Sequence, residues 1–340
     1  MTDRNTPIIR IAPLLRSVCI SLTLLAAAGQ AHGAIEDLID KAKLTSENTA
    51  EISSWMRRQY GQFLGAKNPK EIKNAAQEFT DLIRKSKVKP SDAFLAEYAR
   101  KCSESLSDAA SDENVEKAVW AIVVLVDLDR PETATGLADA LKSQHPSVRV
   151  KAAIGIHRLH KRLKDKAVIA SVLTRLGEAG AAETHSLCLR EIYKAIDFPS
   201  SVPDFKYGNE LAGALAKLFA GRVERLNSGG HDEAMDLPGL AAAAAVASKA
   251  DGLNRGPLAE SLNGLMAHSV ERAVDKQVND ATRTTLIKVA GACETALGKL
   301  ITAGGASAPT DKVSDALKTK NEKKARDALA KWSTAAKAIK

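Results

Sequence analysis

Apolar residues recur at intervals of three and four along most of the chain, and short polar breaks separate the stretches that carry this pattern. That interval matches one face of an α-helix, whereas the strict alternation of a half-buried strand is nearly absent. The single Asp-Gly pair, Asp251–Gly252, has no alternating flanks and therefore does not indicate a hairpin. The pattern predicts an all-α protein.

Polar caps and prolines mark where these helices begin. Asn68-Pro69-Lys70-Glu71 places a cap, a first-turn proline and an acidic residue in the order typical of a helix start, and prolines repeat that signal at 131, 146 and 257. AVWAIVVLVDLD (118–129) is rich in β-branched residues and resembles a buried strand. Because it continues from the capped segment 111–117, its length favours a helix that is apolar on all sides, as in the middle of a helical stack.

The helices between residues 131 and 197 form pairs. Residues 131–144 precede 146–163, residues 165–178 precede about 182–197, and Pro131 lies 34 positions before Asp165. A repeat of this length is typical of stacked helical hairpins, in which each pair buries its apolar face against the next. We therefore expect antiparallel helix pairs arranged in a row.

One of these helices resembles a known repeat. Pro146-Ser147-Val148-Arg149, followed by Ala152, Gly155 and Ile156, is similar to the second helix of a HEAT-type repeat, a family of α-solenoids that serve as binding scaffolds. The resemblance is best over 131–163 and implies an irregular HEAT-like α-solenoid. The turn before Arg149 holds Ser143 and Gln144 where the family usually has an acidic residue. This departure counts against a carboxylate–arginine ladder between repeats with Arg149 as its basic member. The next match, Leu189-Arg190, implies a step of 41 residues.

The same signals divide the chain into five parts. Residues 304–310 (GGASAPT) form the clearest linker, and residues 311–340 carry nine Lys/Arg against four Asp/Glu in a helical pattern. The predicted parts are a signal peptide (1–33), an N-terminal helical region (34–106), a HEAT-like domain (107–303), the linker (304–310) and a basic C-terminal helix (311–340).

The first residues indicate export. Arg4, Arg10 and Arg16 precede the uncharged stretch SVCISLTLLAAA (17–28) and the small residues GQAHGA (29–34), which is the layout of a signal peptide. Cleavage is expected before Ala34, with cleavage after Ala31 as the alternative. An uncleaved anchor is the other interpretation, but twelve uncharged residues fall short of the roughly 20 that span a bilayer. No other segment approaches that length, so we expect a periplasmic or extracellular protein.

Charge and cysteines add two limits. Residues 1–33 hold three arginines and one aspartate, so the net charge of +8 becomes +6 from Ala34 onward. Cys102, Cys188 and Cys293 remain after cleavage, and three scattered cysteines do not form a disulfide framework. We expect buried thiols, while a single disulfide among the three stays open.

Motifs for catalysis and metal binding are absent from the sequence. It contains no Gly-x-Ser-x-Gly, no Walker-type phosphate loop, no Cys-x-x-Cys and no His-Glu-x-x-His. We therefore assign no catalytic residue, cofactor or metal ligand. The best local cluster is His231, Asp232, Glu233 and Asp236, which indicates either a polar loop whose acids cap the next helix or a cation site. His157 and His160 are spaced as a ligand pair, but the basic residues around them disfavour a dication.

The strongest charge feature is the segment 145–166, with seven Lys/Arg, three His and one acidic residue, Asp165. Basic side chains gathered on one helix face attract anions, although such a face is often only solvated. The candidate partner-binding residues are Arg149, Lys151, His157, Arg158, Lys161, Arg162 and Lys164.

Together these features favour an exported, non-catalytic helical-repeat scaffold whose partner is another protein or an anionic component of the cell envelope. Aromatic residues make up only 4% of the chain, which disfavours base stacking on nucleic acid and a sugar-binding cleft. Two alternatives stay open, a structural envelope protein that self-associates through its terminal helices and a helical enzyme with its site near 231–236. The sequence leaves the oligomeric state open.

Overall fold

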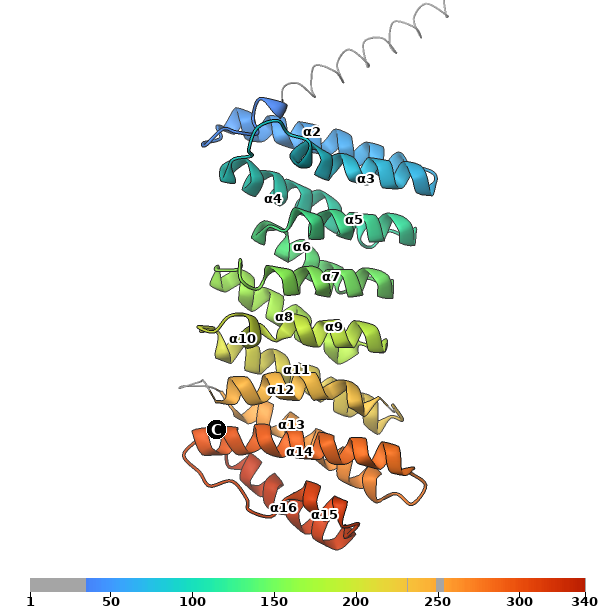
Figure 1. Cartoon of the computed structure of the whole chain (residues 1–340), viewed down its shortest axis with the longest axis vertical. Helices are drawn as coiled ribbons and strands as arrows, with labels where there is room; N and C mark the ends of the chain where they lie inside the picture. The colour runs from blue at the N-terminus through green and yellow to red at the C-terminus, as the bar shows by residue number, and fades with distance from the viewer. Residues whose placement is uncertain (1–34, 231, 249–253, 340) are drawn as a thin grey trace, which may run out of the picture. The chain divides into compact units, whose positions relative to one another are not determined.

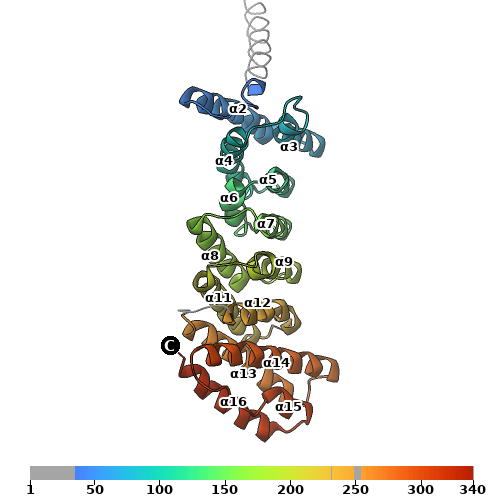
Figure 2. The same ribbon diagram turned by 60° about the vertical axis from the view of Figure 1, so that its left-hand side comes forward.

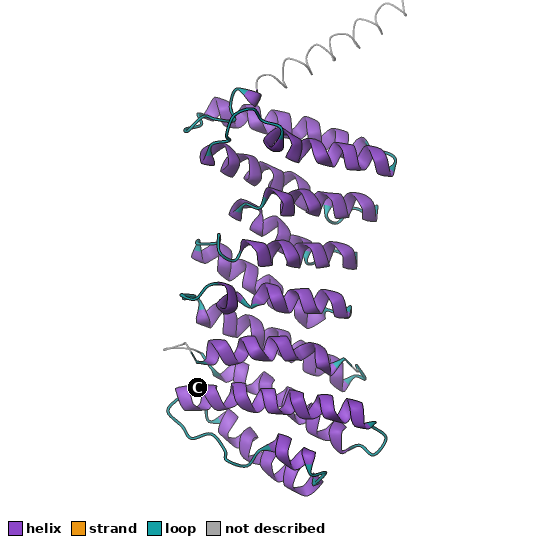
Figure 3. Ribbon diagram, viewed as in Figure 1, coloured by secondary structure: helices purple, strands orange, loops and turns teal. Residues whose placement is uncertain are grey.

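The computed structural model describes residues 35–230, 232–248 and 254–339. Helices make up most of these residues and no strand occurs among them, which confirms the predicted all-α class (Figure 3). The predicted signal peptide, residues 1–33, lies outside the described residues. The described chain divides into two compact units between Lys101 and Cys102. This division and the predicted boundary after residue 106 both fall inside helix α4 (Asp92–Ala109).

The first unit comprises α2 (Ser46–Gly65), α3 (Pro69–Arg84) and the start of α4. Asn68 caps α3 as the sequence predicts, since its side chain accepts a hydrogen bond from the N–H of Glu71 at 3.0 Å. Trp55 packs on Phe79 and Tyr98, with ring centroids 6.2 and 5.6 Å apart. The Tyr98 hydroxyl donates to the carbonyl of Phe79 at 2.8 Å, so the buried hydroxyl of this core has an acceptor.

The second unit, from Cys102 onward, is built from helix pairs (Figure 1). The pair predicted at 131–144 and 146–163 and the pair predicted at 165–178 and 182–197 are both present. After α4, its elements are α5 (Val115–Leu128), η1 (Pro131–Thr133), α6 (Ala134–Ala140), α7 (Pro146–Leu159), α8 (Lys166–Ala182), α9 (Ser186–Ile196), α10 (Phe198–Ser201), α11 (Gly208–Asn227), η2 (Glu233–Asp236), α12 (Leu237–Ala247), α13 (Gly256–Val274), α14 (Asp280–Ala303), α15 (Val313–Lys318) and α16 (Glu322–Lys337).

These helices stack in two layers. One layer runs α6, α8, α11, α13 and α16, and the other runs α5, α7, α9, α12 and α14, with each helix packed on the next of its layer (Figure 2). The segment AVWAIVVLVDL lies in the second layer as α5, which confirms that it is a helix rather than a strand. The unit is an irregular HEAT-like α-solenoid, as the repeat resemblance implies.

Two boundaries differ from the sequence prediction. Helix α7 ends at Leu159, four residues before the predicted end, and residues 160–162 form a turn. The segment 311–340, predicted as one basic helix, forms α15 and α16 instead. Val313 and Trp332 of these two helices are buried, so the segment forms part of the second unit's core. None of the described helices combines the length and the apolarity that a membrane crossing needs.

Glycines allow α8 and α11 to approach each other closely. A Cβ added to Gly177 of α8 would lie 2.7 Å from the carbonyl oxygen of Ala214, and one added to Gly221 of α11 would lie 2.7 Å from the Cα of Ala181. Both contacts involve backbone, which cannot rotate out of the way. The two helices can therefore lie this close together only because glycine, which has no Cβ, stands at positions 177 and 221.

Alanine substitution at two glycines of α11 should have opposite effects on stability. Gly221→Ala should lower the free energy of unfolding by about 1–3 kcal/mol, because it forces α8 and α11 apart. Gly213 has open space around it. Gly213→Ala should therefore raise the free energy of unfolding by about 0.5–1 kcal/mol through helix propensity alone. Urea unfolding of both variants checks the pair, and equal effects would contradict the close approach.

Candidate functional site

Arg149 connects two repeats and is not free to bind a partner. Its guanidinium binds the carboxylate of Glu183 through two hydrogen bonds, Nε–Oε2 at 2.7 Å and Nη2–Oε1 at 2.9 Å. It also donates to the carbonyl of Ser143 at 2.8 Å. Glu183 lies in the turn before α9, so the carboxylate that the turn before α7 lacks is supplied by the following turn. Arg149 thus forms an ion pair that connects two successive helix pairs.

Glu183 is also held by the backbone of its own turn. Its Oε1 accepts hydrogen bonds from the N–H groups of Thr184 at 2.9 Å and His185 at 2.8 Å. Burial acts to raise the pKa of Glu183, but the Arg149 guanidinium and these N–H groups outweigh it and hold the pKa below its ordinary value. The carboxylate is therefore ionised at neutral pH and links the Arg149 side chain to the start of α9.

Two further candidate residues are also engaged. Arg162 lies in the turn after α7, with its Nη2 2.6 Å from Oδ2 of Asp129, and it donates to the carbonyl of Asp129. The side chain of His157 donates from Nδ1 to the carbonyl of Lys194 at 3.0 Å. His160 donates from Nε2 to the neighbouring carbonyl of Ala195 at 2.8 Å. The two histidines thus bond carbonyls in the last turn of α9, which explains their spacing without a metal.

The remaining candidates are exposed and carry no ion pair among the described residues. Lys151 and Arg158 share one face of α7, seven positions apart, and Lys161 and Lys164 follow in the turn beyond it. We call these four residues the basic surface. Because α7 ends at Leu159, the basic surface spans a helix face and a turn rather than one continuous helical stripe.

Aromatic rings, which the sequence interpretation did not single out, gather beside the basic surface. The ring of His160 stacks on the ring of Phe198 in α10, with the ring centroids 3.9 Å apart. The ring centroids of Phe198 and Phe205 are 5.4 Å apart, and those of Phe205 and Tyr207 are 5.5 Å apart. The loop after α10 thus brings rings to the same end of α7 as Lys161 and Lys164. In a chain so poor in aromatics, three such residues within 198–207 were the signal available in the sequence.

His160 should make stability pH-dependent. Burial lowers its pKa to about 4, and His157 acts in the same direction. In the unfolded chain the imidazole of this histidine takes up a proton near pH 6.5. The contribution of His160 to the stability of the folded protein is therefore complete above that pH, and it is lost as the pH falls toward 4. We expect the free energy of unfolding to fall by about 2 kcal/mol between about pH 7 and about pH 5. Urea unfolding should show a flatter pH profile for His160→Gln, and equal profiles would contradict this assignment.

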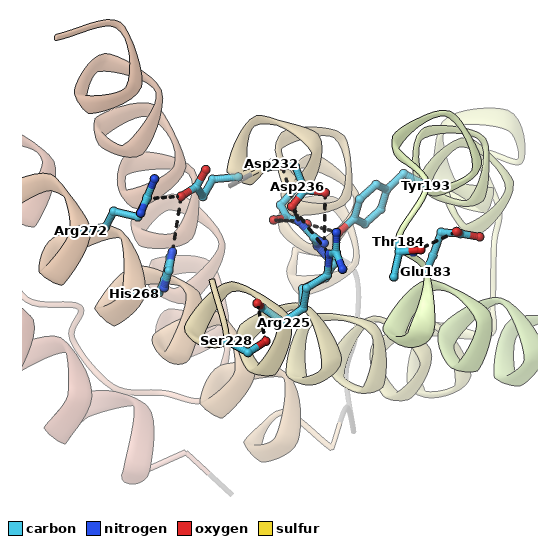
Figure 4. A network of polar contacts seen from close by, with 11 residues as sticks. Glu183, Thr184, Tyr193, Arg225, Ser228, Asp232, Asp236, His268 and Arg272 are labelled. Atoms are coloured by element: carbon cyan, nitrogen blue, oxygen red, sulfur yellow. Dashed lines mark hydrogen bonds and ion pairs between the residues drawn. The ribbon is translucent and has the colours of Figure 1, made fainter. Parts of the chain in front are cut away.

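Asp232 and Asp236 of the acidic cluster at 232–236 lie close together near Tyr193 (Figure 4), and both pair with a buried arginine. Arg222 of α11 is fully buried, and its guanidinium lies 2.8 Å from Asp236 Oδ1 and 2.8 Å from Asp232 Oδ1. The hydroxyl of Tyr193, on α9, donates to Asp236 Oδ1 at 2.6 Å. Burial raises the pKa of Asp236, while Arg222 and Tyr193 act in the opposite direction. The cluster joins α9, α11 and η2 within the core.

The third carboxylate of this segment binds a different helix. Glu233 Oε1 lies 2.8 Å from Nε of Arg272 and 3.5 Å from Nε2 of His268, both on α13. Burial acts to raise the pKa of Glu233, but His268 and Arg272 hold it below its ordinary value.

These contacts bear on the catalytic and metal interpretations. All three carboxylates of the segment face arginines, so they are not arranged as a free acid–base pair or as a cation site. His231 lies outside the described residues. Within the described ranges, no group of three or more His, Cys, Asp or Glu side chains is arranged to hold a metal ion.

The cysteines of the described residues, Cys102, Cys188 and Cys293, are buried, and none of the three forms a disulfide. Cys188 of α9 donates to the carbonyl of Pro146 at 3.3 Å, and burial raises its pKa to about 11. Burial also raises the pKa of Cys293 on α14. A thiol with a raised pKa is a poor nucleophile, so neither of these two cysteines has the environment of a reactive cysteine.

Comparisons with known proteins identify no family. No protein-family model matches the chain, and no curated protein matches it either. One similar solved structure is the crystal structure of Kap121p bound to Ste12p, with a TM-score of 0.41 and 12% sequence identity. That match covers 75% of this chain but 26% of the other, so this chain spans about a quarter of its length. The solenoid architecture described above follows from this chain's own helix packing.

Proposed function

We propose that the protein is an exported, non-catalytic scaffold that holds another protein of the cell envelope against its basic surface. The observation that carries the proposal is the group of four exposed cations, Lys151, Arg158, Lys161 and Lys164, which have no ion pair among the described residues. The neighbouring cations Arg149 and Arg162 are neutralised by carboxylates of the chain itself. Leaving four cations unneutralised along α7 and the turn beyond it favours an acidic partner.

The solenoid supports this proposal. Stacked helix pairs present long, continuous faces, and repeat proteins of this architecture use such faces to bind other macromolecules. Export rests on the sequence pattern of residues 1–33 alone. N-terminal sequencing of the protein from fractionated cells tests this part. An exported form that begins at Ala34 would support the proposal, and recovery only in the cytoplasm would contradict it.

The binding proposal is tested by capture of envelope proteins on the purified protein. Between about 0.1 M and about 1 M salt the screening length falls from about 10 Å to about 3 Å, so binding through exposed charges should weaken steeply. Replacing Lys151 and Arg158 by Glu should abolish the capture. The matched control replaces Lys288 and Lys323, two exposed lysines on other helices, by Glu and should capture the envelope protein normally. Equal binding by both variants would overturn the role of the basic surface.

A further inference from the structure

A pocket opens beside the basic surface, where the chain turns after α7. Its walls come from the turn 160–164, from Ile169 of α8, from α10 and from the loop 202–207. Its volume is about 540 Å³, within the range of roughly 300–1,000 Å³ typical of ligand sites. We call it the aromatic pocket. It is large enough to take one or two bulky side chains of a partner.

One side of the aromatic pocket is apolar. Leu163 and Ile169 line it and are buried, whereas Phe205 and Tyr207 line it and are only half-buried. The hydroxyl of Tyr207 donates to the carbonyl of Lys164 at 3.3 Å, which ties the loop to the turn after α7. At protein interfaces, partly exposed aromatic residues that are held in place in this way often contribute a large share of the free energy of binding.

The other side of the aromatic pocket is cationic. Lys161, Lys164 and Lys206 line it, are exposed and form no ion pair with any described residue, while Asp204 is the one acidic residue of the lining. Helix α11 begins at Gly208, directly after Tyr207, and the side chain of Tyr207 makes no capping hydrogen bond to the helix. The positive end of that helix dipole adds to the lysine charges. The pocket therefore combines an apolar wall with an anion-attracting rim.

A buried histidine ring forms part of the wall of the aromatic pocket. His160 is 1% exposed and lines the pocket, and because its Nε2 donates to Ala195, the neutral ring carries a lone pair on Nδ1. This Nδ1 is buried without a hydrogen-bond partner. Because this ring is neutral, the cationic groups of the lining are its three lysines.

From these features we propose that the aromatic pocket binds a short acidic segment of a partner protein. The segment inserts an aliphatic or aromatic side chain against Phe205 and Tyr207, and its flanking Asp and Glu side chains pair with Lys161, Lys164 and Lys206. This inference rests on the proposed scaffold function, and it adds where the partner is held and by which chemistry.

To test this proposal, peptides that bind the purified protein are selected from a random library. The affinity of each selected peptide is then measured with a labelled synthetic copy. Two variants change the pocket. One replaces Lys161, Lys164 and Lys206 by Glu, and the other is Phe205→Ala. The matched control replaces Lys288, Lys323 and Lys337 by Glu, all exposed and outside the pocket. Thermal unfolding of each variant verifies that it is folded.

The proposal predicts that the selected peptides place Phe, Leu or a similar residue beside Asp or Glu. It also predicts that both pocket variants weaken their binding by about tenfold or more, with the control unchanged. Selected peptides that lack acidic residues, or that bind the pocket variants with full affinity, would overturn it. So would a pocket-dependent affinity for anionic lipid vesicles in the absence of such peptides.

The same variants separate this inference from the proposed function. If the pocket variants still capture an envelope protein in a salt-sensitive manner while the Lys151/Arg158 variant does not, the pocket proposal fails and the scaffold proposal stands. If the unmodified protein captures no envelope protein through the basic surface, and no peptide is selected either, the pocket proposal and the scaffold proposal both fail.

Discussion

Arg222→Met lowers the free energy of unfolding by about 3–5 kcal/mol, the largest effect that we expect from a single substitution. The change leaves the fully buried Asp236 without its counter-charge and Asp232 without its 2.8 Å partner. A buried carboxylate that loses its cation is desolvated without compensation. Urea unfolding followed by circular dichroism measures the loss.

Two further variants show whether the loss comes from the charge. Arg225 lies on the same helix, is partly exposed and approaches Asp232 only to 4.0 Å, so Arg225→Met should cost less than about 1 kcal/mol. Combining Arg222→Met with Asp236→Asn should recover part of the loss, because the buried negative charge is then removed as well. An Arg222→Met variant as stable as Arg225→Met would contradict a structural role for the cluster.

Glu183→Ala should lower the free energy of unfolding by about 2–4 kcal/mol. The substitution removes the carboxylate from Arg149 and leaves the N–H groups of Thr184 and His185 without an acceptor, so two neighbouring helix pairs lose this ion pair between them. Glu178→Ala is the matched control, because Glu178 pairs with Lys217 at the surface. The control should cost less than about 1 kcal/mol.

The effect of Glu183 should disappear in acid. Its pKa is lower in the folded protein than in the unfolded chain. The stabilisation is therefore complete above the ordinary pKa of a glutamate and is lost as the pH falls through the lower folded value. Urea midpoints of the protein and of Glu183→Ala should converge below about pH 4. A difference that persists undiminished there would show that the charge is not its cause.

The sequence was sufficient for the helices and their pairing, but not for every helix end. Asn68 caps α3 and Pro146 begins α7 because these signals are local, within the first turn of each helix. The end of α7 has no glycine or proline beside it. It is set by contacts of His160 with Ala195 and Phe198, which lie more than thirty residues away. Spacing along the chain therefore extended the helix to residue 163.

The same distinction applies to the candidate site. Arg149 and Arg162 belong to the basic segment by sequence, yet their partners Glu183 and Asp129 come from other helix pairs and could not be inferred from local spacing. The exposure of Lys151 and Arg158 follows from the helical pattern, whereas Lys161 and Lys164 are exposed in the turn beyond α7. The aromatic pocket required the fold, since it joins the turn after α7 to the loop 202–207.

The most direct test of the scaffold account is photocrosslinking in living cells from a single exposed position. A photoreactive amino acid replaces Arg158 on the basic surface or, as the control, Lys288 on α14. The account predicts a light-dependent adduct with a discrete protein from position 158, lost when Lys151 and Lys161 are also changed to Glu, and no such adduct from position 288. Equal adducts from both positions, or none from position 158, would contradict it.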